Sequence, residues 1–329
     1  MSEKLLRVAV VGATGTLGRE LIDQLTERRF PIQELVPIAS DHSLGEAVEW
    51  LGHELPMHSE HTLAGLDLVF LCTPQAAALP WLRAALVARV ACIDLTGASA
   101  VQEEIPLLDP DRAPSAAALA SPVLAVPAPA ALALARVVTA LRGASAVQRV
   151  IATVCESASS AGRAGIDALQ AETVALFAQQ APPEETPFTH AVAFDCLAAT
   201  GPIGVGDQSA SEAATLRDFA RLVPAVRAAV SALRVPTFAG LGAQVALELE
   251  TLLPIDAIEK LLEEAPGTRM FGAPGGPSMR DAAGEADVLV GRLRPDPTRV
   301  NGVLLWLALD PVRVAAQAAV RLAELRSAR

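Results

Sequence analysis

The chain has 329 residues and a formal net charge of −11, and 52% of its residues are apolar although only 3% are aromatic. Its length allows two domains with separate cores, and its acidic balance argues against a nucleic-acid-binding protein, because no basic surface is available to neutralise phosphates. The four cysteines are scattered without a CxxC pair, so we predict neither a zinc site nor a disulfide framework, and we expect a reduced, cytoplasmic setting.

The first half of the chain alternates apolar strands with amphipathic helices, which is typical of a parallel α/β sheet. Strands are predicted at Leu6–Val11, Leu35–Ala39, Leu66–Cys72 and Val90–Leu95, and a helix at Ala76–Ala88. The turn GATGTLG follows the first strand and leads into a helix with its leucines on one face. Glycines in that context let a backbone approach a pyrophosphate at a helix N-terminus. The sequence therefore predicts a Rossmann-type, doubly wound domain, and a glycine turn without a ligand is the alternative.

Ligands of such folds bind at the carboxyl ends of the strands, which indicates where a cofactor would lie. The predicted cofactor contacts are Gly12, Thr14, Gly15, Thr16, Leu17, Ser40, Asp41 and Thr73. Asp41 follows the second strand and suits a hydrogen bond to a ribose 2′-hydroxyl, although a solvated turn acid is an equal alternative. Because His42 and Glu46 supply no permanent positive charge nearby, we expect NAD in preference to NADP.

An uncharged run extends from Ala113 to Ala135 and is long enough to cross a bilayer. Four prolines interrupt it, and each would cost about 3 kcal/mol inside a helix, so we predict no membrane span. Instead, Leu124–Pro127 is expected to be the last strand of the first domain. Pro129 suits the first position of a helix over Ala130–Leu141, because the missing N–H has no partner there anyway.

The second half predicts an α+β domain with a mixed or antiparallel sheet. The expected strands lie at 147–155, 233–238, 244–250, 286–294 and 300–309, and those at 233–238 and 244–250 are expected to pair antiparallel. The expected helices lie at 161–180 and 212–230, from Pro254, and from Pro311 to the end. The first of these helices has Ile166, Leu169, Thr173 and Leu176 on one face, and the second is bent at Pro224. We assign residues 1–128 and 311–329 to the nucleotide-binding domain and residues 129–310 to the second. An uncovered apolar sheet face would favour a homodimer.

Several stretches in a fixed order, among them VAVVGATGTLGREL, SAGRAGIDAL, LRVPTFAG and ADVLVGRLR, resemble the aspartate-semialdehyde dehydrogenase family along nearly the whole chain. The resemblance implies a nucleotide domain closed by the C-terminal helix and a central catalytic and dimerisation domain. It also implies NADP-dependent reductive dephosphorylation of aspartyl phosphate through a cysteine thioester.

The residues that the family uses for this chemistry are replaced in this chain. The nucleophilic cysteine of the family matches Pro129, its histidine matches Leu241, and its phosphate-binding arginine matches Ala100. The matching candidates for a substrate pocket are Glu156, which stands for a glutamine, Arg163 and Arg234. Arg163 could instead be a solvated side chain without a ligand. Arg234 could instead form an ordinary salt bridge on its strand.

These replacements favour a homodimeric, non-catalytic paralogue similar to the Usg-type proteins, with an unidentified protein partner and with NAD(P) binding left open. The first alternative is an NAD(P)-dependent oxidoreductase acting on an aldehyde or acyl substrate with altered chemistry, using Glu156 as proton donor or Cys155 as a relocated nucleophile. The second is a partner-binding scaffold without nucleotide. The stretch HELPMHSEH, 53–61, is expected to be a strand and turn with solvated histidines, so no metal is predicted.

Overall fold

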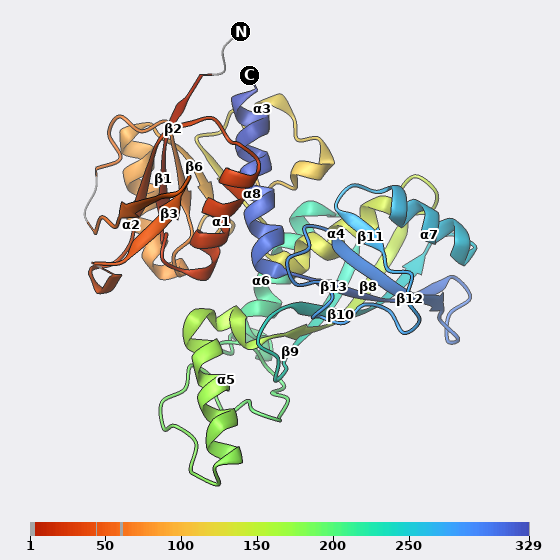
Figure 1. Ribbon diagram of the computed structural model, residues 1–329. Helices are drawn as coiled ribbons and strands as arrows, with labels where there is room; N and C mark the ends of the chain where they lie inside the picture. The colour runs from red at the N-terminus through yellow and green to blue at the C-terminus, as the bar shows by residue number, and fades with distance from the viewer. Residues whose placement is uncertain (1–3, 44, 60–61, 329) are drawn as a thin grey trace. The chain divides into compact units, whose positions relative to one another are not determined.

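The computed structural model describes residues 4–43, 45–59 and 62–328. The chain divides into two compact units, Met1–Pro127 with Ala315–Arg329, and Ala128–Val314. Figure 1 shows the first in red to orange with the blue C-terminal helix, and the second in yellow-green to blue.

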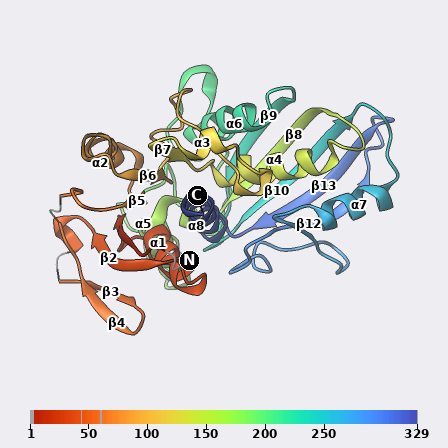
Figure 2. The ribbon, with the colours of Figure 1, turned by 90° about the horizontal axis from the view of Figure 1, so that it is seen from above.

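The first unit is built on a five-stranded parallel sheet of order β2-β1-β5-β6-β7. Its strands are β1 (Leu6–Val11), β2 (Ile32–Ile38), β5 (Leu68–Leu71), β6 (Ala91–Asp94) and β7 (Val123–Ala125). The helices are α1 (Thr16–Glu27), α2 (Gln75–Ala88) and the short α3 (Ala116–Leu119). The chain leaves β1 for β2 on one side and then returns to β5 on the other, which confirms the predicted doubly wound sheet (Figure 2).

A hairpin follows β2 and consists of β3 (Ala47–Trp50) and β4 (His53–Pro56). The predicted extended conformation of the histidine-containing stretch is therefore confirmed for its first part. Glu60 and His61 lie outside the described residues.

The C-terminal part of α8 (Pro311–Ser327) belongs to the first unit from Ala315 onward. Arg28 holds it by a two-pronged ion pair, because Nε and Nη2 each donate to one Glu324 carboxylate oxygen at 2.7 Å. Nη1 of Arg326 donates to the backbone carbonyls of Leu119 and Ser121. Charged hydrogen bonds thus tie the last helix to α1 and to the α3 region.

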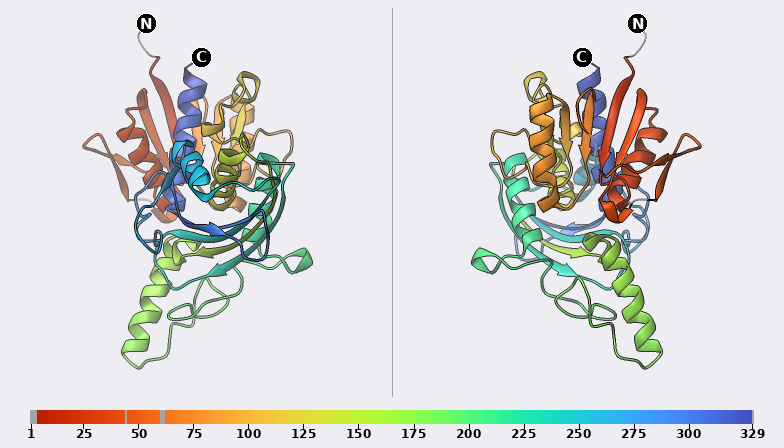
Figure 3. Two further views of the ribbon diagram at one scale, coloured as in Figure 1. Left: turned by 90° about the vertical axis from the view of Figure 1, so that its right-hand side faces the viewer. Right: turned by 90° about the vertical axis from the view of Figure 1, so that its left-hand side faces the viewer.

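The second unit carries a six-stranded mixed sheet of order β11-β12-β13-β10-β8-β9. Its strands are β8 (Val147–Glu156), β9 (Arg227–Arg234), β10 (Leu241–Leu249), β11 (Thr268–Met270), β12 (Val288–Pro295) and β13 (Gly302–Leu309). The helices are α4 (Pro129–Leu141), α5 (Gly162–Phe177), α6 (Ala210–Leu222) and α7 (Ile255–Glu264). Helices α4 and α7 lie over one face of the sheet, and α5 extends from the other side (Figure 3). The predicted mixed sheet is confirmed.

Two predictions about this sheet are wrong. The helix expected over 212–230 ends at Leu222, and the chain from Arg227 is strand β9. The alanines of that stretch favour a helix in isolation, but Pro224 cannot continue one, and pairing with β8 supplies the backbone bonds instead. The expected pairing of the next two strands is also wrong, because β8 lies between β9 and β10.

The buried face of α5 also differs from the prediction. The helix buries Gly165, Leu169, Glu172 and Ala175, whereas Leu176 is 49% exposed. A Cβ at Gly165 would lie 2.2 Å from the Ala158 carbonyl oxygen, so the backbone approaches its neighbour along this glycine face. Close backbone contact and a buried carboxylate, rather than an apolar stripe, therefore set the orientation of the helix.

The carboxylate of Asp67, just before β5, predicts a pH-dependent part of the stability. It accepts hydrogen bonds from the Arg7 backbone N–H and from Lys4 Nζ, each at 2.9 Å, and these two bonds lower the pKa of Asp67. A lowered native pKa adds stability above the unfolded pKa of about 3.9, and that stability is lost as the pH falls through the native value. Asp67→Asn should therefore lose about 1 kcal/mol at pH 7, a figure reduced for partial solvent exposure.

Urea denaturation at pH 7 and pH 3 measures this effect, and the difference between wild type and Asp67→Asn should shrink at pH 3. Glu104→Gln, at an exposed position of the same unit, is the control for loss of one negative charge. An unchanged difference at the two pH values would contradict the assignment.

Candidate functional site

The glycine turn after β1 brings three backbone segments into contact. Gly12 has φ +88°, and a Cβ there would lie 2.7 Å from the Cys72 carbonyl oxygen at the end of β5. A Cβ on Gly18 would lie 2.2 Å from the Gly12 carbonyl oxygen. Helix α1 has Gly15 as its N-cap, without a side-chain cap, so the N–H groups of its first turn are left for a ligand.

The predicted cofactor contacts gather at one edge of the first sheet, because β2, β1 and β5 are adjacent and parallel. Thr16 is exposed and Leu17 is half-buried at the start of α1, while Ser40 and Asp41 are exposed after β2. The Thr14 and Ser43 hydroxyls lie 3.1 Å apart and join the two loops. The topology therefore places these candidates around one possible ligand.

Thr73, which follows β5, adds a feature that fits a ligand. Its hydroxyl is buried and makes no hydrogen bond within the described part of the chain. A buried hydroxyl without a partner is costly, and a phosphate or ribose oxygen would satisfy it. Together with the glycine turn, which only a residue without a side chain can form, Thr73 makes these loops fit a dinucleotide.

The expected preference for NAD over NADP rests on His42 and Glu46, and the structure describes the side chain of Glu46 alone. The side chain of His42 lies outside the described residues, whereas exposed Glu46 forms an ion pair with Arg19 at 3.0 Å. Sequence reasoning did not consider Arg19, whose Nε also donates to the Thr14 carbonyl at 3.0 Å. Its charge is matched by Glu46, so no unpaired cation is added by this contact.

In the second unit, helix α4 begins as predicted, with Ala128 as N-cap and Pro129 in the first turn. The Ala128 backbone N–H donates to the buried carboxylate of Asp218 at 2.8 Å. Burial raises the pKa of Asp218, and the bonds from Ala128 and Arg217 oppose that rise. Sequence reasoning missed Asp218, because an acid in the middle of a helix gives no sign of a partner 90 residues away.

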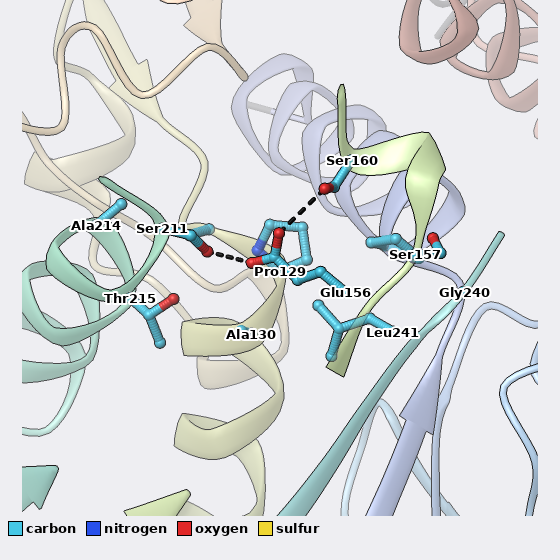
Figure 4. Close-up of a pocket in the computed structure, with 12 residues that line it drawn as sticks. Pro129, Ala130, Glu156, Ser157, Ser160, Ser211, Ala214, Thr215, Gly240 and Leu241 are labelled. Atoms are coloured by element: carbon cyan, nitrogen blue, oxygen red, sulfur yellow. Dashed lines mark hydrogen bonds between the residues drawn. The ribbon is translucent and has the colours of Figure 1, made fainter. Parts of the chain in front are cut away.

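A cavity of about 240 Å³ opens at this helix start. It is lined by Ala128, Pro129, Ala130, Glu156, Ser157, Ser160, Ser211, Ala214, Thr215, Gly240, Leu241 and Pro311. Figure 4 shows Pro129 and Leu241 near Glu156, so the structure brings these three predicted positions together. Within this lining set, which consists of described residues, Glu156 is the only ionisable side chain.

Glu156 ends β8 and is 8% exposed. Its two carboxylate oxygens accept hydrogen bonds from the Ser211 hydroxyl and, at 3.0 Å, from the Ser160 hydroxyl (Figure 4). Ser211 is held in the first turn of α6, where Ser209 and Glu212 form a capping box. Serines in helix starts are common as caps, so their sequence pattern did not single out Ser160 or Ser211.

Arg234, at the end of β9, is 5% exposed and lies beside Glu156, with Nη1 3.9 Å from Oε2. Nη1 also donates to the Ser157 carbonyl at 2.6 Å and to the Ser160 hydroxyl. The Phe188 ring covers the guanidinium at 5.0 Å from Cζ to the ring centroid. Burial lowers the pKa of Arg234, and the negative charge of Glu156 opposes this shift.

Two other candidates lie apart from this cluster. The side chain of Arg163 is 86% exposed, lies 3.5 Å from Asp167 on the same helix, and does not line the cavity. Cys155 directly precedes Glu156 on β8 and therefore points to the opposite sheet face. Burial raises the pKa of the Cys155 thiol, which disfavours the reactive thiolate.

The described residues hold no group of three or more histidine, cysteine or acidic side chains placed to bind a metal ion. None of the helices that these same residues form is long and apolar enough to span a membrane.

A parallel sheet with a glycine turn at its switch point, joined to a mixed-sheet unit with a cavity at a helix start, defines a two-domain fold of the dehydrogenase class. The family description "Semialdehyde dehydrogenase, NAD binding domain" matches residues 7–120, and "Semialdehyde dehydrogenase, dimerisation domain" matches residues 138–314. The chain therefore belongs to the semialdehyde dehydrogenase family.

Individual relatives agree with this assignment. The chain is 30% identical over 328 residues to aspartate-semialdehyde dehydrogenase 2 of Vibrio cholerae, with 97% of this chain and 96% of that protein covered. It is also 30% identical over 325 residues to the USG-1 protein homolog of Azotobacter vinelandii, with the same coverage. The structure of V. cholerae aspartate semialdehyde dehydrogenase II complexed with ASA matches with a TM-score of 0.92 at 28% identity and covers 98% of each chain. The predicted family resemblance and fold class are confirmed.

Proposed function

We propose that this protein is a homodimeric, non-catalytic paralogue of aspartate-semialdehyde dehydrogenase that retains a dinucleotide site in its first unit and acts in the cytoplasm through a protein partner. One observation carries the proposal. The cavity at the start of α4 presents Pro129 and Leu241, and its described lining contains no thiol, imidazole or cationic side chain.

The family reaction requires groups that these positions do not supply. A thioester forms when a thiolate attacks a carbonyl carbon, and a neighbouring acid–base group must take and return the proton. Pro129 has neither a nucleophile nor a backbone N–H, and the aliphatic side chain of Leu241 cannot transfer a proton. The position that the resemblance assigns to the phosphate-binding arginine is Ala100, which is buried at 1% exposure.

The homodimer is supported by the match to a dimerisation domain and by the outer face of the second sheet. On the face of β8 opposite Glu156, Ile151 is 40% exposed, and β8 lies inside the sheet rather than at its edge. An apolar side chain exposed in the middle of a sheet favours coverage by a second copy.

Isothermal titration calorimetry with NADH and NADPH tests the nucleotide part of the proposal. We expect NADH to bind more tightly, because Glu46 pairs with Arg19 and so neutralises the cation that the described residues of this region offer to a 2′-phosphate. Light scattering on the same sample should give the mass of a dimer. Tighter binding of NADPH would refute the preference for NAD, and absence of binding by both would support a scaffold without nucleotide.

Oxidation of aspartate semialdehyde in the presence of phosphate and NAD or NADP tests the non-catalytic part. We expect no turnover above the rate without protein. The second candidate function is an oxidoreductase with altered chemistry, and it is favoured by one observation, the buried Glu156 carboxylate within the cavity. Turnover that persists in Cys155→Ser and is lost in Glu156→Gln would support that second function and contradict the first.

A further inference from the structure

The Glu156 carboxylate receives the contacts that an anionic ligand would otherwise receive. We propose that Glu156 is a built-in anion: it occupies the anion-binding position formed by Arg234, Ser160 and Ser211, so the cavity excludes carboxylates and phosphates and selects uncharged polar ligands. This inference rests on the proposed function only in using the same cavity.

The contacts of Glu156 carry the first step. Two hydroxyl donors, Ser211 and Ser160, each bind one of its oxygens, and the Arg234 guanidinium lies 3.9 Å from Oε2. Hydroxyl donors combined with a guanidinium are a favoured environment for a carboxylate or phosphate. Here the chain itself supplies the anion, so the two hydroxyl donors are already engaged and the guanidinium already has a negative charge beside it.

The surroundings of Arg234 carry the second step. A second cavity, of about 380 Å³, is lined by Arg234 and Phe188, and Ser160 lines both this cavity and the first. An anion that approaches Arg234 from the first cavity meets the negative charge of Glu156. On the other side, the Phe188 ring already covers the guanidinium. The approach from the first cavity is therefore unfavourable for a free anion, whereas on the side of the second cavity the Phe188 ring closes only one face of the guanidinium.

The other groups that line the first cavity indicate which class of ligand it can bind once anions are excluded. Thr215 lines it, is 3% exposed, and places a hydroxyl group in the lining. The first-turn N–H groups of α4 begin at the same place, after Pro129. With Glu156 as the only charge in this described lining, an alcohol or amide would satisfy these groups without repulsion.

Replacement of the built-in anion by a free one tests the proposal. In Glu156→Ala, formate should occupy the vacated position and raise the melting temperature by about 3 °C, because a ligand that binds only the folded state stabilises it. Formamide, which has the same shape without the charge, should not. Wild type and Glu250→Ala, at an exposed position after β10, should not be stabilised by formate, because Glu156 still occupies the anion position in both.

The same response of Glu156→Ala and wild type to formate would overturn the proposal. If Glu156→Ala does not fold, Glu156→Gln is titrated with malonate instead, and its affinity should exceed that of wild type by about tenfold. Equal affinity would again overturn the proposal. These readouts involve neither nucleotide nor turnover, so they are independent of the tests of the proposed function.

Discussion

Gly18→Ala is expected to lose about 3 kcal/mol of unfolding free energy, although alanine is the better helix former. The added methyl group would lie 2.2 Å from the Gly12 carbonyl oxygen and 2.8 Å from the Ala13 Cα. Both are backbone atoms, so no flexible side chain can move aside to relieve the overlap. Helix α1 would have to shift away from the turn that leads into it, and the nucleotide site would be distorted.

Urea denaturation measures the loss, and calorimetry with NADH should show weaker binding by Gly18→Ala than by wild type. Gly143→Ala is the matched control, because a Cβ at Gly143 meets no atom within 4 Å and should change stability by less than about 1 kcal/mol. If Gly18→Ala were as stable as Gly143→Ala, the close approach of α1 to its own turn would be contradicted.

Glu172→Ala is expected to lose about 3 kcal/mol and to loosen the segment that carries Phe188. The Glu172 carboxylate, 2% exposed on α5, accepts the backbone N–H of Val192 at 2.7 Å and of Ala193 at 3.0 Å. Alanine would leave two buried N–H groups without an acceptor, and each such group costs about 1–3 kcal/mol. Glu172→Gln keeps an acceptor and should lose less.

Limited proteolysis and urea denaturation together measure this effect, with faster cleavage expected within residues 186–193 of Glu172→Ala. Glu184→Ala, at an exposed position of the same loop, is the control and should leave both readouts unchanged. Cleavage of Glu172→Ala at the wild-type rate would mean that other contacts, rather than this carboxylate, hold the loop.

Much of the fold follows from local patterns that act over a few residues. Strand β1 and the glycine turn were predicted correctly because an apolar run before such a turn leaves few other conformations. The start of α4 was also predicted correctly, because proline is compatible with the first turn of a helix and disfavoured inside it. The family assignment rests on such segments and on their order along the chain.

The sequence allowed a prediction of the site only at positions that match a functional residue of the family one by one. Pro129, Leu241 and Glu156 were expected in one pocket from the resemblance, and the structure brings them together at one cavity. Ser160 and Ser211 were missed, because serines near helix starts are common, and Ser211 also lies 55 residues from its partner Glu156.

The sequence by itself determined which segments form strands, turns and helix starts wherever hydrophobic periodicity, glycine and proline act locally. Only the tertiary structure decided between equally good local states: residues 227–234, rich in alanine, form a strand because β8 offers them backbone partners. It likewise decided that α5 buries Glu172, since two backbone N–H groups 20 and 21 residues away both donate to its Oε2 atom. The physical reason is the same in each case, because the free energy of a buried polar group depends on partners that the neighbouring sequence does not contain.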